Sequence, residues 1–206
     1  GQPFLTAATF SGPRSALATP PFIFIARTVA TSTTQAGANP AIYSYGHRNP
    51  QGLVVHPETG DVWAIEHGPQ GGDEINLVQA GANYGWPVVG YGVNYGPGSA
   101  IHAASMREGW ENPRHVWVPS IGTSGLMMYD GERFPAWRGD LFAGGLTGEV
   151  LVRVSLDGEV VTGSEDLVKR MGRIRDVRQG PDGFIYVAFE SRSGDPSRIV
   201  RLEPAY

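Results

Sequence analysis

The sequence predicts an all-β fold of the propeller type, in which a small sheet, or blade, is repeated along the chain. Gly (29 residues) and Pro (16 residues) exceed their average usage of about 7% and about 5%, which indicates many tight turns and hence many short strands. Runs of β-branched and aromatic residues recur between turns that contain Gly, Asp or Pro. The turn residues Asp140 and Asp182 lie 42 positions apart, as expected for a propeller blade of about 40–50 residues.

Composition excludes several classes of function. Hydrophobic residues make up 41% of the chain and charged residues 17%, which is typical of a globular protein. The net charge is −4 and the longest basic run is Lys169-Arg170, so nucleic acid is not an expected partner. No apolar stretch approaches the ~20 residues of a membrane span. Cysteine is absent, which excludes disulfides and a Cys-based metal site.

The chain divides at about residue 36. Residues 1–35 are rich in Ala, Thr, Ser and Pro and are predicted to form an N-terminal extension, in which only residues 21–25 have the pattern of a strand. Residues 36–206 are predicted to form a partial propeller with blades at about 36–82, 120–170 and 171–206. The expected strands are 51–55, 62–65 and 74–78 in the first blade, 124–129, 139–143 and 150–154 in the second, and 174–177, 184–188 and 198–202 in the third.

Residues 83–119 are predicted to form an insertion loop between the first two blades. The loop is rich in Gly and aromatic residues, and residues 103–109 have a composition that would allow one or two helical turns. Long loops between blades usually lie on the binding face. Three blades do not close a ring, because closed rings have about 4–8 blades. Either further blades complete the ring, or a second copy pairs with the open blade edges to form a homodimer.

Residues 66–76 (Glu-His-Gly-Pro-Gln-Gly-Gly-Asp-Glu-Ile-Asn) are the main candidate for a functional site. Pro69 has no N–H and ends a strand, which leaves main-chain carbonyls exposed there. Carbonyls beside carboxylates suit a hard cation such as calcium. The other interpretation of the same residues is a Gly-rich surface turn. Asp73 and Glu74 are expected to accept hydrogen bonds from nearby backbone N–H groups, or alternatively to support the calcium indirectly, by holding the groups that bind it.

Several motifs together resemble a known family. They are Gly-His-Arg-Asn-Pro-Gln-Gly-Leu at 46–53, the 66–76 stretch, Asn-Tyr-Gly-Trp-Pro at 83–87, and Gly-Arg-Ile-Arg-Asp-Val at 172–177. In this order they resemble the C-terminal half of the soluble aldose/glucose dehydrogenases that depend on pyrroloquinoline quinone (PQQ), the glucose/sorbosone dehydrogenase family. The resemblance implies a six-bladed propeller that holds PQQ and calcium and oxidises aldose sugars to lactones. It also implies a periplasmic or secreted protein that passes electrons to a respiratory or artificial acceptor.

The resemblance assigns roles to individual residues. It places Arg48, near the quinone oxygens, and Asn49 on the cofactor, and it makes the carbonyls of Gly68 and Pro69 the calcium ligands. Arg173 and Arg175 line the far wall. Their side chains project to one side because strand side chains alternate with a period of two, and they could pair with carboxylates. His67 is either a cofactor contact or a turn histidine.

One departure from the family concerns the catalytic base. In the family the base is a histidine ahead of the segment that corresponds to residues 46–53, and here residues 1–35 contain no histidine. The base is therefore not assigned to any residue, and the isolated chain is expected to be inactive. Two alternative functions stay open: a non-catalytic binding or assembly module, and a calcium-dependent lactonase-like propeller, which would need several carboxylate and Asn ligands.

Overall fold

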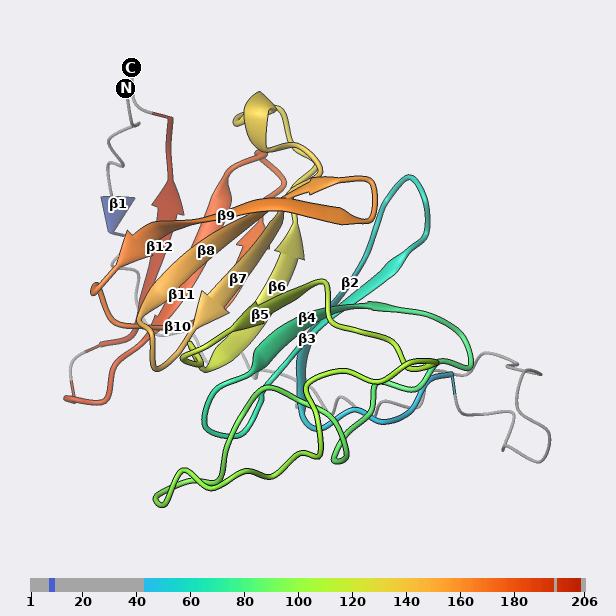
Figure 1. Ribbon diagram of the computed structural model, residues 1–206. Helices are drawn as coiled ribbons and strands as arrows, with labels where there is room; N and C mark the ends of the chain where they lie inside the picture. Colours follow the sequence, from blue (N-terminus) through green and yellow to red (C-terminus); the bar gives the residue numbers. More distant parts are fainter. Residues whose placement is uncertain (1–7, 10–42, 195, 205–206) are drawn as a thin grey trace.

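The structure, a computed structural model, describes residues 8–9, 43–194 and 196–204. These residues form three four-stranded antiparallel sheets, which lie side by side in chain order as an open arc (Figure 1). The prediction of an all-β propeller with about three blades and an incomplete ring is confirmed. The strand predicted at residues 21–25 lies outside the described residues, as does nearly all of the predicted extension 1–35.

The first blade contains β2 (Pro50–Val55), β3 (Val62–Glu66), β4 (Asp73–Val78) and β5 (His115–Trp117), paired in that order. The first three strands follow the expected positions to within one residue at each end. The sequence analysis did not identify β5, which lies inside residues 83–119. The long loop therefore connects the third and fourth strands of the first blade, and it returns to pair Asp73 with Trp117.

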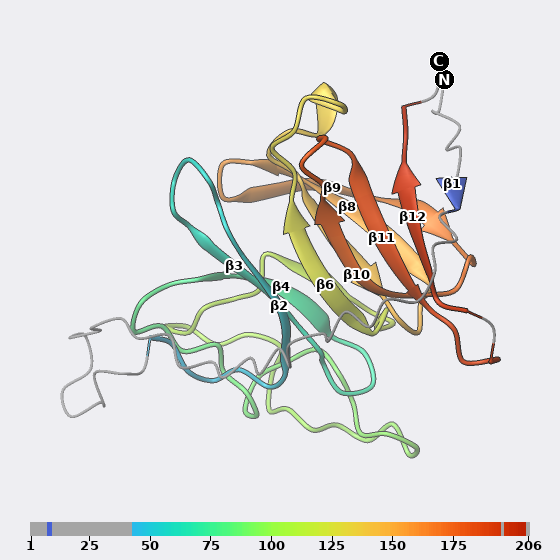
Figure 2. The same cartoon turned by 180° about the vertical axis from the view of Figure 1, so that it is seen from behind.

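The second and third blades repeat this plan. The second contains β6 (Thr123–Met128), β7 (Leu141–Gly145), β8 (Val150–Asp157) and β9 (Val160–Lys169), of which β9 was not predicted. The third contains β10 (Arg173–Gln179), β11 (Ile185–Glu190) and β12 (Arg198–Leu202). Figure 2 shows β1 (Ala8–Thr9) along the outer edge of β12, where it completes this sheet.

The one helical element of the described residues is a 3-10 turn, η1 (Pro135–Trp137), in the loop between β6 and β7. The expected helical turns at 103–109 are wrong: this segment consists of turns, bends and an isolated bridge between Val89 and Ala104. Backbone hydrogen bonds from Ala103 to Val88 O and from Gly90 to Ala104 O tie it to residues 88–90 instead. Pairing across the loop thus satisfies the groups that a helix would have paired internally.

Alternating side chains of the second blade build the two layers of the core. Leu126 and Met128 on β6 pack toward the first blade, whereas Met127, which lies between them, packs toward the third. This alternation is the period of two expected for a strand buried on both faces. Phe142 on β7 joins the layer toward the third blade, and its neighbour Leu141 joins the other. Each blade is therefore held by the apolar side chains of the next.

Glycines allow the inner strands β2, β6 and β10 to approach one another closely. A Cβ on Gly52 of β2 would lie 2.8 Å from the backbone nitrogen of Leu126 on β6. A Cβ on Gly125 of β6 would lie 2.2 Å from Asp176 Oδ1 on β10. The hydroxyl of Ser124 donates a hydrogen bond to Ile174 O (2.7 Å) and brings the beginnings of β6 and β10 together. The same ends of the three blades consequently share one rim, which we call the site rim.

Candidate functional site

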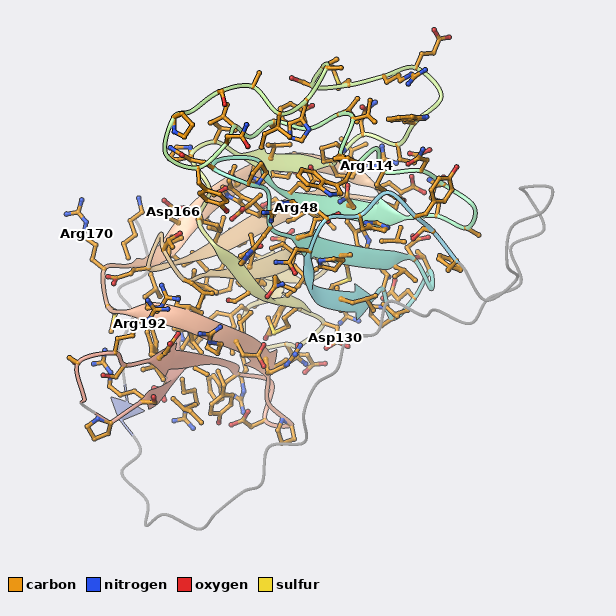
Figure 3. All side chains as sticks on the ribbon, turned by 90° about the horizontal axis from the view of Figure 1, so that it is seen from below. Arg48, Arg114, Asp130, Asp166, Arg170 and Arg192 are labelled. Carbon is orange, nitrogen blue, oxygen red and sulfur yellow. The ribbon has the colours of Figure 1, made fainter. Side chains whose placement is uncertain are left out.

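All the residues that the sequence analysis assigned to the cofactor or metal lie on the site rim. Arg48 and Asn49 precede β2, residues 67–69 follow β3, and Arg173 begins β10 with Arg175 two positions further. Figure 3 is viewed from this side and shows Arg48 on the first blade, with Arg170 and Arg192 on the part of the rim that belongs to the second and third blades. The fold thus brings segments that are more than a hundred residues apart in sequence to one side of the molecule.

Glu66, the last residue of β3, organises the rim of the first blade. Its side chain is 3% exposed, and its Oε2 accepts the backbone N–H groups of Arg48 (2.6 Å) and Asn49 (3.1 Å). Its Oε1 accepts hydrogen bonds from His47 Nδ1 (2.9 Å) and Asn76 Nδ2 (3.0 Å). A buried carboxylate with four donors is well compensated for its loss of water. Glu66 therefore fixes the backbone from which the Arg48 side chain extends.

The guanidinium of Arg48 lies between the first blade and the long loop. Arg48 Nη1 donates a hydrogen bond to His67 O at 3.1 Å, and Arg48 Cζ lies 5.2 Å from the centre of the Trp86 ring. A cation over an indole face at this distance is a favourable contact. The side chain is half-buried, so its charge remains accessible from the rim. Its position next to the 67–68 peptide puts it beside the residues predicted to bind the metal.

Gly68 and Pro69, which we call the 68–69 bend, form a tight turn. A Cβ on Gly68 would lie 2.3 Å from the carbonyl oxygens of both Gly71 and Gly72, so only glycine fits this position. Neither Gly68 O nor Pro69 O accepts a backbone hydrogen bond from the other described residues. Within the same residues, no group of three or more His, Asp or Glu side chains is arranged to hold a metal ion. The hypothesis of a calcium site therefore rests on the main-chain carbonyls.

His67 and Asp73 connect this bend to the second blade. The ring of His67 donates a hydrogen bond from Nε2 to Thr123 O, because a carbonyl oxygen can only accept. Asp73 accepts backbone N–H groups from Gly68 (3.0 Å), Gly122 (2.7 Å) and Thr123 (3.1 Å). The expectation that Asp73 would accept backbone hydrogen bonds in this loop is confirmed. The hydroxyl of Thr123 is buried and has no partner among the described residues.

Arg173 and Arg175 converge on one carboxylate at the far side of the rim. Arg173 Nε donates to Glu190 Oε2 at 3.2 Å, and Arg175 Nη2 donates to the same oxygen. The hydrogen bond from Arg173 contributes most to holding the pKa of Glu190 below its ordinary value. The two arginines therefore project to one side of β10, as their spacing predicted, and they already share a carboxylate. The side chain of Arg175 is the more exposed of the two, at 53% against 16% for Arg173.

A pocket opens between the site rim and the long loop. Arg48, His67 and the 68–69 bend line one side, and Trp86, Tyr91 and His102 are among the residues on the other. Glu74 lies within it, and its pKa is raised to about 7, first by burial and then by the neighbouring charges of Glu66 and Asp73. A pocket with aromatic walls, a few polar groups and a titratable group is typical of a small-molecule site.

No individual role was predicted from the sequence for Glu66, which lies within the 66–76 stretch, or for Glu190. The two residues occupy the same position in their blades, since each ends the second strand and each binds an arginine-bearing segment at the beginning of the inner strand. The signal available in the sequence was a glutamate directly after an apolar run. The run is Val-Trp-Ala-Ile in the first blade and Tyr-Val-Ala-Phe in the third. Such a charge is costly to bury unless it has donors nearby.

The comparison with protein families tests the resemblance directly. The family model described as "Glucose / Sorbosone dehydrogenase" matches residues 28–201, which is most of the chain. The chain belongs to the glucose/sorbosone dehydrogenase family. The matched range contains every residue of the site rim named above.

Individual members of the glucose/sorbosone dehydrogenase family agree with this assignment. The aldose sugar dehydrogenase YliI of Escherichia coli (strain K12) is 43% identical over 175 residues, which cover 82% of this chain and 46% of that protein. A crystal structure of a glucose dehydrogenase superposes with a TM-score of 0.77 at 43% identity, covering 87% of this chain and 52% of that one.

A third comparison concerns a protein with cofactor bound. The PQQ-bound form of the aldose sugar dehydrogenase from Streptomyces coelicolor superposes with a TM-score of 0.63 at 27% identity, covering 84% of this chain and 48% of that one. The chain thus spans about half the length of these relatives. Among the residues that the structure describes, no helix is long and apolar enough to cross a membrane.

Proposed function

We propose that this chain forms the part of a PQQ- and calcium-dependent aldose sugar dehydrogenase that holds the cofactor and the metal. The observation that carries the proposal is the hydrogen bond from Arg48 Nη1 to His67 O, which sets a guanidinium directly beside the 68–69 bend. An anionic quinone and a calcium ion that share a site need a cation and a set of oxygen donors in this relationship. Membership of the family and the similarity to a PQQ-bound structure support the same assignment.

The residues present fit the chemistry of the cofactor. PQQ has three carboxylates and an o-quinone, and Arg48, Arg173 and Arg175 supply three guanidinium groups on one rim. Planar guanidinium groups suit carboxylates because two parallel N–H donors match the two oxygens. The unpartnered hydroxyl of Thr123, next to the Asp73 and His67 contacts, is a further polar group at this position. The carbonyls of Gly68 and Pro69 are hard donors suited to calcium.

Each residue then has a definite role. Arg48 stabilises negative charge on the quinone oxygens, and Asn49, whose backbone Glu66 also fixes, contributes its amide to the cofactor. Arg173 and Arg175 bind cofactor carboxylates at the far wall. Bound PQQ would supply the two-electron oxidant for the sugar, whose C1 would lose a hydride and whose C1 hydroxyl would lose a proton to give a lactone. We assign His67 to holding the bend against Thr123, since its Nε2 proton is already committed there.

The proposal assigns no catalytic base. Proton removal from the sugar hydroxyl requires a base within hydrogen-bond reach, and no residue of the chain matches the family position for it. We therefore propose that the chain alone binds PQQ and calcium without turning over aldose. Three further parts of the proposal are supported only by membership of the family. They are a sugar substrate, an electron acceptor that reoxidises the cofactor, and a periplasmic location.

Thermal unfolding with and without ligands tests the proposal. A ligand that binds only the folded state stabilises it, by about 2.7 kcal/mol at a hundred times its Kd. For a chain of this size, this corresponds to a rise in Tm of about 5–10 °C. We expect this rise when PQQ and calcium are added together, and a much smaller one for Arg48→Met. An unchanged Tm in the wild-type chain would overturn the proposal.

A second candidate function is self-association through the open face of the first blade. Leu53 and Val55 on β2 are 39% and 52% exposed, on the face that points away from the second blade. Apolar side chains on an open sheet face favour association with another blade. A mass measurement in solution decides this: a dimer supports it if Leu53→Lys with Val55→Lys gives a monomer, and a monomeric wild-type chain contradicts it.

A further inference from the structure

Asp73, the first residue of β4, is buried among backbone donors rather than cations. The residue is 1% exposed, and its carboxylate accepts hydrogen bonds from three backbone N–H groups, which come from two different blades. Three hydrogen bonds from backbone N–H groups offset the cost of burying a carboxylate. Asp73 Oδ1 binds the first blade through Gly68 N, and its Oδ2 binds the second blade through Gly122 N and Thr123 N.

These contacts fix one particular peptide plane. The peptide that links His67 to Gly68 is planar, so its C=O and N–H point in opposite directions. Its oxygen accepts a hydrogen bond from Arg48 Nη1 at 3.1 Å, and its N–H donates to Asp73 Oδ1 at 3.0 Å. The plane is therefore held at both ends. The residue that follows Gly68 is Pro69, whose ring fixes φ, so few torsions remain free to turn the two carbonyls of the bend.

A second contact restrains the bend from the side of the long loop. A Cβ on Gly92 would lie 2.5 Å from Pro69 Cγ and 2.4 Å from Gly71 O, so the loop backbone packs directly on the proline ring. The His67 ring also donates a hydrogen bond to the carbonyl oxygen of Thr123, and the backbone N–H of the same residue donates to Asp73. Movement of the bend relative to the second blade would break the Asp73 contacts and the His67 contact together.

We propose that Asp73 is a positioning residue that fixes the 68–69 bend against the second blade and thereby sets the affinity of the bend for calcium. The inference rests on the proposed function, since it assumes that the carbonyls of Gly68 and Pro69 ligate the metal. Asp73 is proposed to act through the bend and not as a ligand, because both of its oxygens already accept hydrogen bonds from backbone N–H groups. Groups that orient the ligands of a metal typically contribute 10- to 100-fold to its affinity.

The test compares Asp73→Asn with a matched variant, Asp140→Asn. Asp140 is also buried, at 5% exposure, and accepts hydrogen bonds from Arg153 Nε (2.6 Å) and Leu156 N (3.2 Å) at the opposite rim of the second blade. Both variants lose a buried carboxylate, so both are expected to lower the free energy of unfolding. Only Asp73→Asn is expected to alter the bend.

Calcium binding to the wild-type chain and to both variants is measured by calorimetry, at a temperature where all three are folded. We expect Asp73→Asn to raise the Kd for calcium by about 10- to 100-fold and Asp140→Asn to change it by less than about twofold. Hydrogen exchange without metal gives a second readout: the amides of Gly68, Gly122 and Thr123 should lose protection in Asp73→Asn alone. Terbium, which replaces calcium and is sensitised by tryptophan, extends the titration to weak binding.

The outcomes separate the inference from the function on which it rests. A wild-type chain that binds neither calcium nor terbium overturns the proposed function, and the inference with it. A wild-type chain that binds calcium, with Asp73→Asn binding equally well, overturns the inference alone. Equal weakening by Asp73→Asn and Asp140→Asn would also overturn it, because the effect would then come from general loss of stability.

Discussion

Glu66 and Arg48 are joined through the backbone: Glu66 Oε2 accepts the N–H of Arg48 at 2.6 Å. This contact places a buried negative charge under the segment that carries the guanidinium, and not on the guanidinium itself. The side chain of Arg48 instead reaches His67 O and the ring of Trp86. Arg48 therefore keeps a positive charge that no carboxylate of the described residues neutralises through an ion pair, which suits the proposed binding of an anionic cofactor.

Glu66→Gln is predicted to destabilise the fold substantially. Each oxygen of the Glu66 carboxylate accepts two hydrogen bonds, whereas an amide has one accepting oxygen and one donating nitrogen. In Glu66→Gln the amide nitrogen would therefore face N–H donors and could not accept from them. A buried donor left unpaired costs about 1–3 kcal/mol, and the four contacts of Glu66 make at least one such loss unavoidable. We expect the free energy of unfolding, measured in urea, to fall by about 2–4 kcal/mol.

The control for this variant is Glu165→Gln. Glu165 pairs with Arg153 at the surface, where its side chain is 44% exposed. Exposed ion pairs contribute about 0–1 kcal/mol, so this variant should unfold close to the wild-type midpoint. Equal midpoints for the two variants would show that the Glu66 contacts contribute little to stability.

Gly68→Ala is predicted to distort the 68–69 bend. The new Cβ would lie 2.3 Å from two carbonyl oxygens of the backbone, which a side-chain rearrangement cannot relieve. We expect a loss of about 2–4 kcal/mol in the free energy of unfolding, together with loss of calcium binding. Gly163→Ala on β9 is the matched control, because nothing lies within 4 Å of its added Cβ. Wild-type calcium affinity in Gly68→Ala would contradict the assignment of the bend to the metal.

The strand pattern was predictable because alternation and turns are local. The strands around Trp63, Phe142 and Val187 were expected within one or two residues of their observed positions, since each is a short run of apolar residues next to a Gly- or Pro-containing turn. β9 was missed because only one of its ten residues, Val168, is buried, and residues 162–166 include no hydrophobic residue. β5 was missed because it is only three residues long and lies at the end of a long loop, so it is too short to show the alternation of a strand.

The candidate site was predictable only where a residue belongs to a local motif. Arg48 and Gly68 stand within such motifs, whereas the role of Glu190 depends on antiparallel pairing that places it opposite Arg173. Asp73 shows the same limit: its acceptance of backbone hydrogen bonds was expected, but its contact with Gly122, 49 positions away, exists only after two blades pack. Tertiary contacts of this kind leave no periodic signal in the sequence.

Glu190→Gln is predicted to strengthen the binding of PQQ. Glu190 pairs with Arg173 and Arg175, so it competes with any anion that would bind these two guanidinium groups. Its negative charge also repels the carboxylates of the cofactor. Removing this charge should lower the Kd for PQQ by about 3- to 10-fold, as measured by quenching of tryptophan fluorescence. Glu203→Gln, which removes the partner of Arg201 in the third blade, should leave the Kd unchanged. Weaker binding in Glu190→Gln would instead mean that Glu190 orients the two arginines.

Glu74→Gln is predicted to stabilise the protein at alkaline pH and to have little effect at acidic pH. Burial and the charges of Glu66 and Asp73 raise the pKa of Glu74 from 4.5 to about 7. Below pH 4.5 the carboxyl group is protonated in both states and has no effect. Between about pH 4.5 and pH 7 the folded protein retains a proton that the unfolded chain has lost, so the free energy of unfolding falls as the pH rises.

Above pH 7 the folded state bears the full cost of a buried charge, about 3 kcal/mol from the shift in pKa. Glutamine stays neutral and its oxygen can still accept the hydrogen bond from Asn76. Urea unfolding at pH 5 and pH 8 should therefore show that the gain from Glu74→Gln grows by about 2–3 kcal/mol between the two. Glu108→Gln, at an exposed position in the long loop, is the control. A gain that is the same at both pH values would show that Glu74 does not titrate in this range, because only a change in its protonation makes the cost of its burial depend on pH.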